Sequence, residues 1–72
     1  MTNTEKLEER ILRSGKKKGY LAEKLGLTRQ GFRNCITNKA EFRASHIQIL
    51  CDELHITDLK ERQAIFFARS GA

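Results

Sequence analysis

The sequence predicts an all-α domain built from five short helices. Apolar residues recur every three or four positions in successive segments, which is the spacing of a helix that buries one face. No segment has the pattern of a convincing strand, and the chain contains no proline to interrupt a helix. Of its 72 residues, 39% are hydrophobic and 32% charged, so we expect residues 1–72 to form a single small globular domain.

The first helix is predicted over residues 4–13. The segment before it offers several capping residues, and Glu5 follows Thr2 at the spacing of a capping box. Its apolar face consists of two residues four positions apart, Leu7 and Ile11. Gly15 can end the helix because glycine tolerates a positive φ.

The second and third helices are predicted over residues 18–25 and 28–37, with only a short turn between them. Gly26 is a stop signal for the first of this pair, and Thr28 can cap the second. After glycine, asparagine is the residue most willing to adopt the left-handed conformation, so Asn38 can end the third helix. Residues 38–43 then form a loop.

The last two helices are predicted over residues 44–54 and from Asp58 onward, where Thr57 and Asp58 favour a helix start. We expect the core to consist of the apolar residues that share one face of each helix. From the second helix onward these are Leu21, Leu25, Leu27, Phe32, Ile36, Ile47, Leu50 and Leu54, with Cys35 and Cys51 as small buried hydrophobes.

The last predicted helix carries more apolar residues than one face can bury. At about 100° per residue, Leu59 and Phe66 point within about 20° of one another and form the predicted core stripe. Ile65 and Phe67 lie about 100° to either side, so we expect one of them to be exposed in a protein interface, with Phe67 favoured. The alternative is that the helix simply packs on the core with one aromatic ring half exposed.

The net charge of +5 is concentrated in one part of the chain. Residues 16–43 contain eight Lys and Arg against two Glu, which is +6, whereas the segments on either side are close to neutral. Localised positive charge of this kind is typical of a surface that contacts a polyanion.

The sequence lacks the residues that several classes of function require. No apolar run is long enough to span a membrane and no secretion signal is recognisable, so we expect a cytoplasmic protein without membrane partners. His46 and His55 have no companions at metal-ligand spacing, and we expect neither metal nor cofactor. No nucleophile is accompanied by a base and an orienting group, so we do not expect an enzyme.

The segment from Leu21 to Asn34 is the most informative part of the chain. Two helices joined by so short a turn must cross steeply, which requires the small Ala22 where their backbones approach and Gly26 at the turn. This crossing projects the first half of the second helix of the pair outward, where it fits a DNA major groove.

This segment resembles the helix-turn-helix of the Cro/CI-type phage repressor family. The resemblance implies a compact five-helix repressor-like bundle whose second and third helices form the motif. The short length, the Arg-Gln-x-x-Arg-Asn stretch at residues 29–34 and the Phe66-Phe67 pair are most similar to the modulators of repression, the Cro-like antirepressors of Gram-positive temperate phages. That similarity implies a transcriptional regulator of a lytic–lysogenic switch in the bacterial host cell.

The third helix and its surroundings supply the candidate DNA contacts. The residues expected to read base edges are Arg29, Gln30, Arg33 and Asn34. The residues expected to contact the DNA backbone are Lys16, Lys17, Lys18, Thr28, Thr37, Lys39 and Arg43. Within this set, Lys18 matches the position of a phosphate-contacting glutamine in the family. The alternative interpretation is an exposed polar helix face and a solvated run of lysines.

Two functions remain open at this point. In the first, the protein binds operator DNA, as a homodimer that places two copies of the third helix one duplex turn apart. In the second, it is an antirepressor that binds the DNA-reading domain of a CI-type repressor and has little DNA affinity. Glycines at positions 19 and 31 and the acidic clusters Glu5/Glu8/Glu9 and Asp52/Glu53 motivate the second function.

Overall fold

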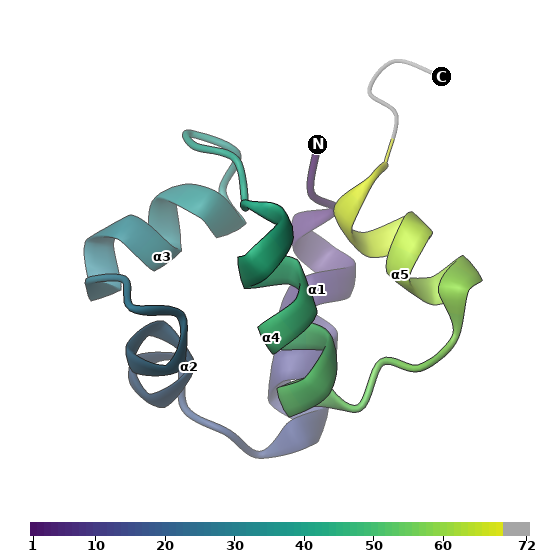
Figure 1. The fold of residues 1–72 in the computed structure, drawn as a ribbon, viewed down its shortest axis with the longest axis horizontal. Helices are drawn as coiled ribbons and strands as arrows, with labels where there is room; N and C mark the ends of the chain where they lie inside the picture. The colour runs from purple at the N-terminus through teal and green to yellow at the C-terminus, as the bar shows by residue number, and fades with distance from the viewer. Residues whose placement is uncertain (69–72) are drawn as a thin grey trace.

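The computed structural model describes residues 1–68, and every helix predicted from the sequence is present in it (Figure 1). The helices are α1 (Thr4–Ser14), α2 (Lys18–Leu25), α3 (Arg29–Ile36), α4 (Ala44–Leu54) and α5 (Leu59–Phe66). The predicted bounds agree with these to within one residue, and the described residues contain no strand. The fold is therefore all-helical, as predicted.

The helix α4 lies at the centre of the molecule, with α2 and α3 on one side and α5 on the other (Figure 1). It packs against α1 and α2, while α5 packs against α1. The buried apolar residues form one cluster shared by all five helices. The predicted core residues of α1 to α4 are buried, and the predicted core residue Leu27, between α2 and α3, is partly buried and packs against the edge of that cluster.

Both cysteines are buried and free, as expected from the sequence. Desolvation raises the pKa of the Cys35 and Cys51 thiols, which disfavours the reactive thiolate form. These residues serve as small apolar side chains in the interior.

The start of α1 differs from the predicted capping box. Asn3 is the capping residue, and its side chain accepts the backbone N–H of Lys6 at 3.1 Å. Thr2 is buried because the Asn38 side chain pairs with its backbone, accepting the Thr2 N–H at 2.8 Å and donating to the Thr2 carbonyl at 2.9 Å. This pairing places Thr2 beside the end of α3 and leaves the cap to its neighbour.

The same N-terminal segment connects the ends of α3 and α5. The Thr4 hydroxyl donates to the carbonyl of Ile36 at 2.6 Å, and the backbone N–H of Asn3 donates to the carbonyl of Ile65 at 2.6 Å. The C-terminal end of α3 is therefore fixed by contacts far away in the sequence.

The predicted core stripe of α5 is right for Phe66, which is buried, and wrong for Leu59. Leu59 is 73% exposed, whereas Ile65 is only 1% exposed, so Ile65 belongs to the core and cannot serve as an interface residue. The count of 100° per residue gives the direction of each side chain but not where along its axis the helix meets the rest of the protein. Leu59 begins the helix at its solvated end, whereas Ile65 and Phe66 lie where α5 meets α1 and the ring of Phe42.

No helix within residues 1–68 is long and apolar enough to cross a bilayer.

Candidate nucleic-acid interface

The connection between α2 and α3 is three residues long, from position 26 to position 28. Gly26 has a φ of 71°, a left-handed conformation that glycine adopts without strain. The Leu27 N–H then donates to the carbonyl of Ala22 at 2.9 Å, which closes the end of α2. The Thr28 hydroxyl accepts the N–H of Gly31 at 3.0 Å and caps α3. The sequence predicted the stop at Gly26 and the cap at Thr28.

The helix α3 has one buried and one exposed face. Its apolar residues Phe32, Cys35 and Ile36 are buried, while Arg29, Gln30 and Arg33 are exposed. Asn34 is half-buried, and its side-chain oxygen accepts an N–H of Gln30 at 2.9 Å. The four predicted base-reading residues therefore lie outside the apolar core, with Gln30 and Asn34 held together.

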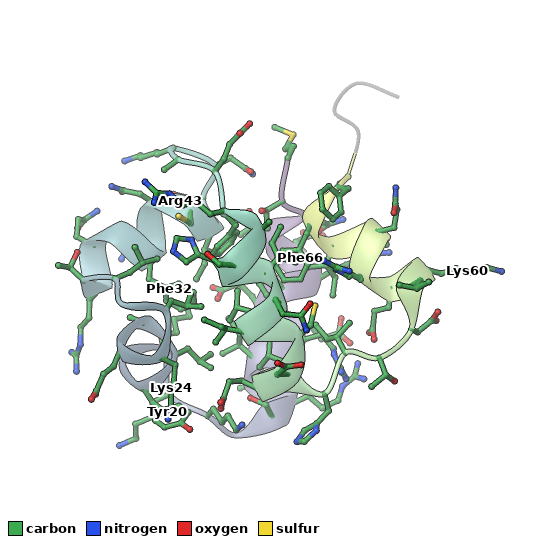
Figure 2. The ribbon with its side chains drawn as sticks, in the orientation of Figure 1. Tyr20, Lys24, Phe32, Arg43, Lys60 and Phe66 are labelled. Carbon is green, nitrogen blue, oxygen red and sulfur yellow. The ribbon has the colours of Figure 1, made fainter. Side chains whose placement is uncertain are left out.

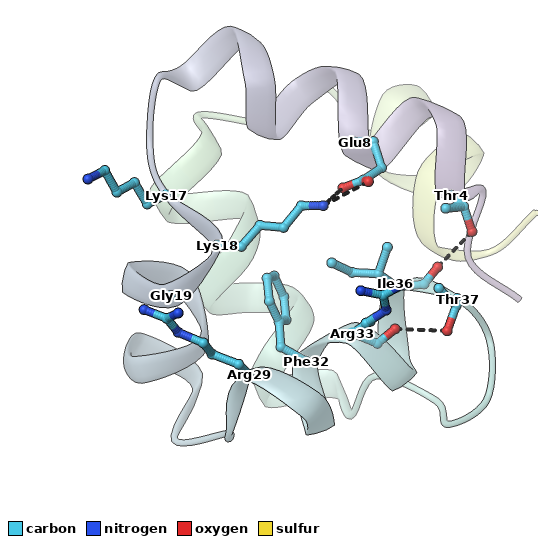
Figure 3. Close-up of a pocket in the computed structure, with 10 residues that line it drawn as sticks. All are labelled: Thr4, Glu8, Lys17, Lys18, Gly19, Arg29, Phe32, Arg33, Ile36 and Thr37. Carbon is cyan, nitrogen blue, oxygen red and sulfur yellow. Dashed lines mark hydrogen bonds and ion pairs between the residues drawn. The ribbon is translucent and has the colours of Figure 1, made fainter.

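A groove of about 480 Å³ lies between α1, the start of α2 and α3 (Figure 3). Phe32 and Ile36 contribute apolar surface to it. The charged residues that line it are Glu8, Lys17, Lys18, Arg29 and Arg33. Because the Lys17 side chain points away from it (Figure 3), three cations and one carboxylate make this groove a positively charged recess beside the exposed face of α3.

Arg29 is seated against the backbone of Gly19 at one side of the groove (Figure 3). A Cβ atom at Gly19 would lie only 3.0 Å from a guanidinium nitrogen of Arg29. Glycine inside a helix costs about 1 kcal/mol relative to alanine. The Arg29 guanidinium is the far end of an exposed, flexible side chain that could shift to admit a Cβ, so this contact alone does not require glycine. The sequence alone offers no signal of this contact.

The three consecutive lysines at the start of α2 make different contacts. The Lys16 ammonium is held by α4, with Glu53 Oε1 at 2.8 Å and the Glu53 carbonyl at 2.7 Å. The Lys18 ammonium pairs with Glu8 of α1. Lys17 is exposed, forms no ion pair within residues 1–68, and points away from the groove (Figure 3). Of the three lysines, only Lys17 has an ammonium without an ion-pair partner among the described residues, so it is the most available to another molecule.

The contacts of Glu53 connect Lys16 to α4. A hydrogen bond from Lys16, and then one from the Tyr20 hydroxyl at 3.1 Å, lower the pKa of the Glu53 carboxyl. The carboxylate therefore stays ionised and holds the Lys16 ammonium at the end of α4. The expected contact of Lys16 with the DNA backbone stays a prediction.

The remaining candidate backbone contacts lie around the ends of α3. The Thr28 hydroxyl is exposed while it caps the helix, and the Thr37 hydroxyl donates to the carbonyl of Arg33 at 2.9 Å. Lys39 and Arg43 are exposed in and after the loop that follows α3. Arg43 extends from the start of α4 toward the side of the molecule where α3 lies (Figure 2).

Phe67 is 48% exposed at the end of α5, as the sequence predicted. We expect Phe67→Ser to change the free energy of unfolding by no more than about 1 kcal/mol, because much of the ring already contacts solvent. The substitution should reduce self-association or pairing with a repressor, measured by a thermal melt and analytical ultracentrifugation. Leu59→Ser, at the opposite end of α5, is the matched control. A large loss of stability with association unchanged would place Phe67 in the core.

Comparisons of this chain with protein-family models, curated proteins and solved structures found no match. Within residues 1–68, no group of three or more His, Cys, Asp or Glu could hold a metal ion.

Proposed function

We propose that this protein is a helix-turn-helix transcriptional regulator that binds operator DNA through α3. The observation that carries the proposal is the exposed polar face of α3 beside a short glycine-containing turn and a cationic groove. In this proposal α2 and α3 form the helix-turn-helix, and the protein binds operator DNA in the cytoplasm of a bacterial host without catalysing a reaction. The resemblance to phage modulators of repression supports a role in a lytic–lysogenic switch.

The proposed readers have side chains suited to base edges in the major groove. Arg29 and Arg33 each present a guanidinium that can donate two parallel hydrogen bonds to guanine, and Gln30 can pair with adenine. Each well-formed pair of this type contributes about 1–3 kcal/mol of discrimination against the wrong base. Two copies of α3 would need to lie roughly 34–36 Å apart to read half-sites one duplex turn apart.

The proposed phosphate contacts come from the exposed cations at the start of α2 and after α3, namely Lys17, Lys39 and Arg43. We expect Lys17→Ala to weaken binding to all DNA sequences equally, because a phosphate contact carries no base information. The slope of log affinity against log salt should become shallower by about one unit, measured by fluorescence anisotropy at several salt concentrations. A loss confined to one DNA sequence would instead make Lys17 a base reader.

The direct test is to select DNA duplexes from a randomised library with the purified protein and then titrate them. We expect one sequence pattern to be enriched and to bind far more tightly than random duplex, with a steep dependence on salt. Absence of both enrichment and salt-dependent binding would refute the proposal.

A second candidate function, binding to a CI-type repressor, is favoured only by the exposed ring of Phe67. The acidic residues that could meet a basic repressor surface are largely occupied within the chain. Three of them form ion pairs, and these pairs are Glu8–Lys18, Glu9–Arg13 and Glu53–Lys16. DNA binding is therefore the better supported function.

A further inference from the structure

We propose that Glu8 limits the affinity of this surface for DNA by occupying Lys18 in place of a backbone phosphate. The inference rests on the DNA-binding function proposed above, and it concerns a member of the acidic cluster Glu5/Glu8/Glu9. Its consequence is that one cation of the groove is neutralised from within the protein.

Both carboxylate oxygens of Glu8 lie close to the Lys18 ammonium. The Lys18 ammonium lies 2.7 Å from Glu8 Oε1 and 2.8 Å from Glu8 Oε2. The two side chains meet across the groove, one from the middle of α1 and the other from the first residue of α2 (Figure 3). Both are accessible, with 54% of the Lys18 side chain and 41% of the Glu8 side chain exposed. A phosphate could therefore reach the same ammonium if the carboxylate were absent.

The position of Glu8 matters because of its neighbours. Among the described residues that line the groove it is the only carboxylate, and the cations Arg29 and Arg33 line it as well. A phosphate that approached Lys18 would have to share its ammonium with Glu8 and remain close to the negative charge of that carboxylate. A carboxylate offers a lysine ammonium much the same acceptors as a phosphate, so Glu8 competes with DNA for Lys18.

The variant Glu8→Gln keeps the size of the side chain and removes its charge. We expect it to release Lys18 for a phosphate contact, which steepens the slope of log affinity against log salt by about 0.9. One added contact of this kind corresponds to roughly five-fold tighter binding at about 0.15 M salt. The gain should be the same for a selected duplex and for a random one, because the new contact carries no base information.

The chain contains a matched control next to Glu8. Glu9 lies on the same helix, forms an ion pair with Arg13 at 2.7 Å, and does not line the groove. The variant Glu9→Gln changes the net charge by the same amount, so it measures the effect of charge alone. Because salt screens exposed charges that lie away from the DNA, we expect Glu9→Gln to change DNA affinity by less than about two-fold.

A second pair of variants tests the role of Lys18 itself. In the wild-type background, Lys18→Ala removes the ammonium and also leaves the Glu8 carboxylate unpaired in the groove, so this substitution alone does not isolate the contact of Lys18. In the Glu8→Gln background, the same substitution should abolish the roughly five-fold gain. A general effect of Glu8 on the fold would not depend on Lys18 in this way.

The experiment titrates the full chain and these variants with fluorescein-labelled duplexes of about 20 base pairs, one random and one selected by the wild-type protein. Circular dichroism melts verify that each variant is folded. The proposal is overturned if Glu8→Gln and Glu9→Gln tighten binding equally, or if Lys18→Ala leaves the gain from Glu8→Gln intact. Absence of DNA binding by the wild type and every variant would instead refute the proposed function, and the inference with it.

Discussion

Replacing Phe32 with alanine should unfold a large fraction of the protein at room temperature. The ring is 1% exposed and makes an edge contact with Phe42, with ring centroids 6.1 Å apart. Phe42 in turn contacts Phe66 at 5.8 Å, so a chain of aromatic rings connects α3 to α5. Truncating a buried phenylalanine costs about 3–5 kcal/mol, which approaches the whole stability that one small core provides.

The chain supplies its own control for this experiment in Phe67, which is 48% exposed. Phe67→Ala removes the same atoms but should change the free energy of unfolding by no more than about 1 kcal/mol. Urea denaturation followed by circular dichroism at 222 nm, the usual wavelength for α-helix, measures both variants. Equal stabilities for the two variants would show that Phe32 does not support the contact between α3 and the core.

The helices could be predicted closely because the signals that define them are local. The turn between α2 and α3 depends on Gly26 and Thr28, each of which acts within a few residues of its own position. The burial of Phe32 follows from the apolar spacing of a single helix. The exposed face of α3 follows from the same spacing, since polar residues occupy the opposite side.

The features that could not be predicted depend on partners far away in the sequence. The error at Leu59 arose because periodicity cannot say which turn of α5 meets α1 and Phe42. Similarly, the sequence presents three adjacent lysines as equivalent. Only the packing of α1 and α4 brings Glu8 to Lys18 and Glu53 to Lys16.

The second large effect is expected at the proposed reading surface. Arg29→Ala and Arg33→Ala should each weaken binding to the selected duplex by about 1–3 kcal/mol, which is roughly five-fold to more than a hundred-fold. Both side chains are exposed, so neither substitution should change the thermal midpoint appreciably. Binding to random duplex should fall much less, because only the charge contribution is lost there.

Arg13→Ala is the matched control for these two variants. The Arg13 side chain is 59% exposed and pairs with Glu9 on α1, so its removal also lowers the positive charge by one without touching α3. If the Arg29 and Arg33 variants lose their preference for the selected duplex over the random one and the Arg13 variant keeps it, the effect comes from base reading and not from net charge. If all three variants bound the selected duplex like the wild type, α3 would not be the reading helix, and Phe67 would remain as the exposed feature favouring a protein partner over DNA.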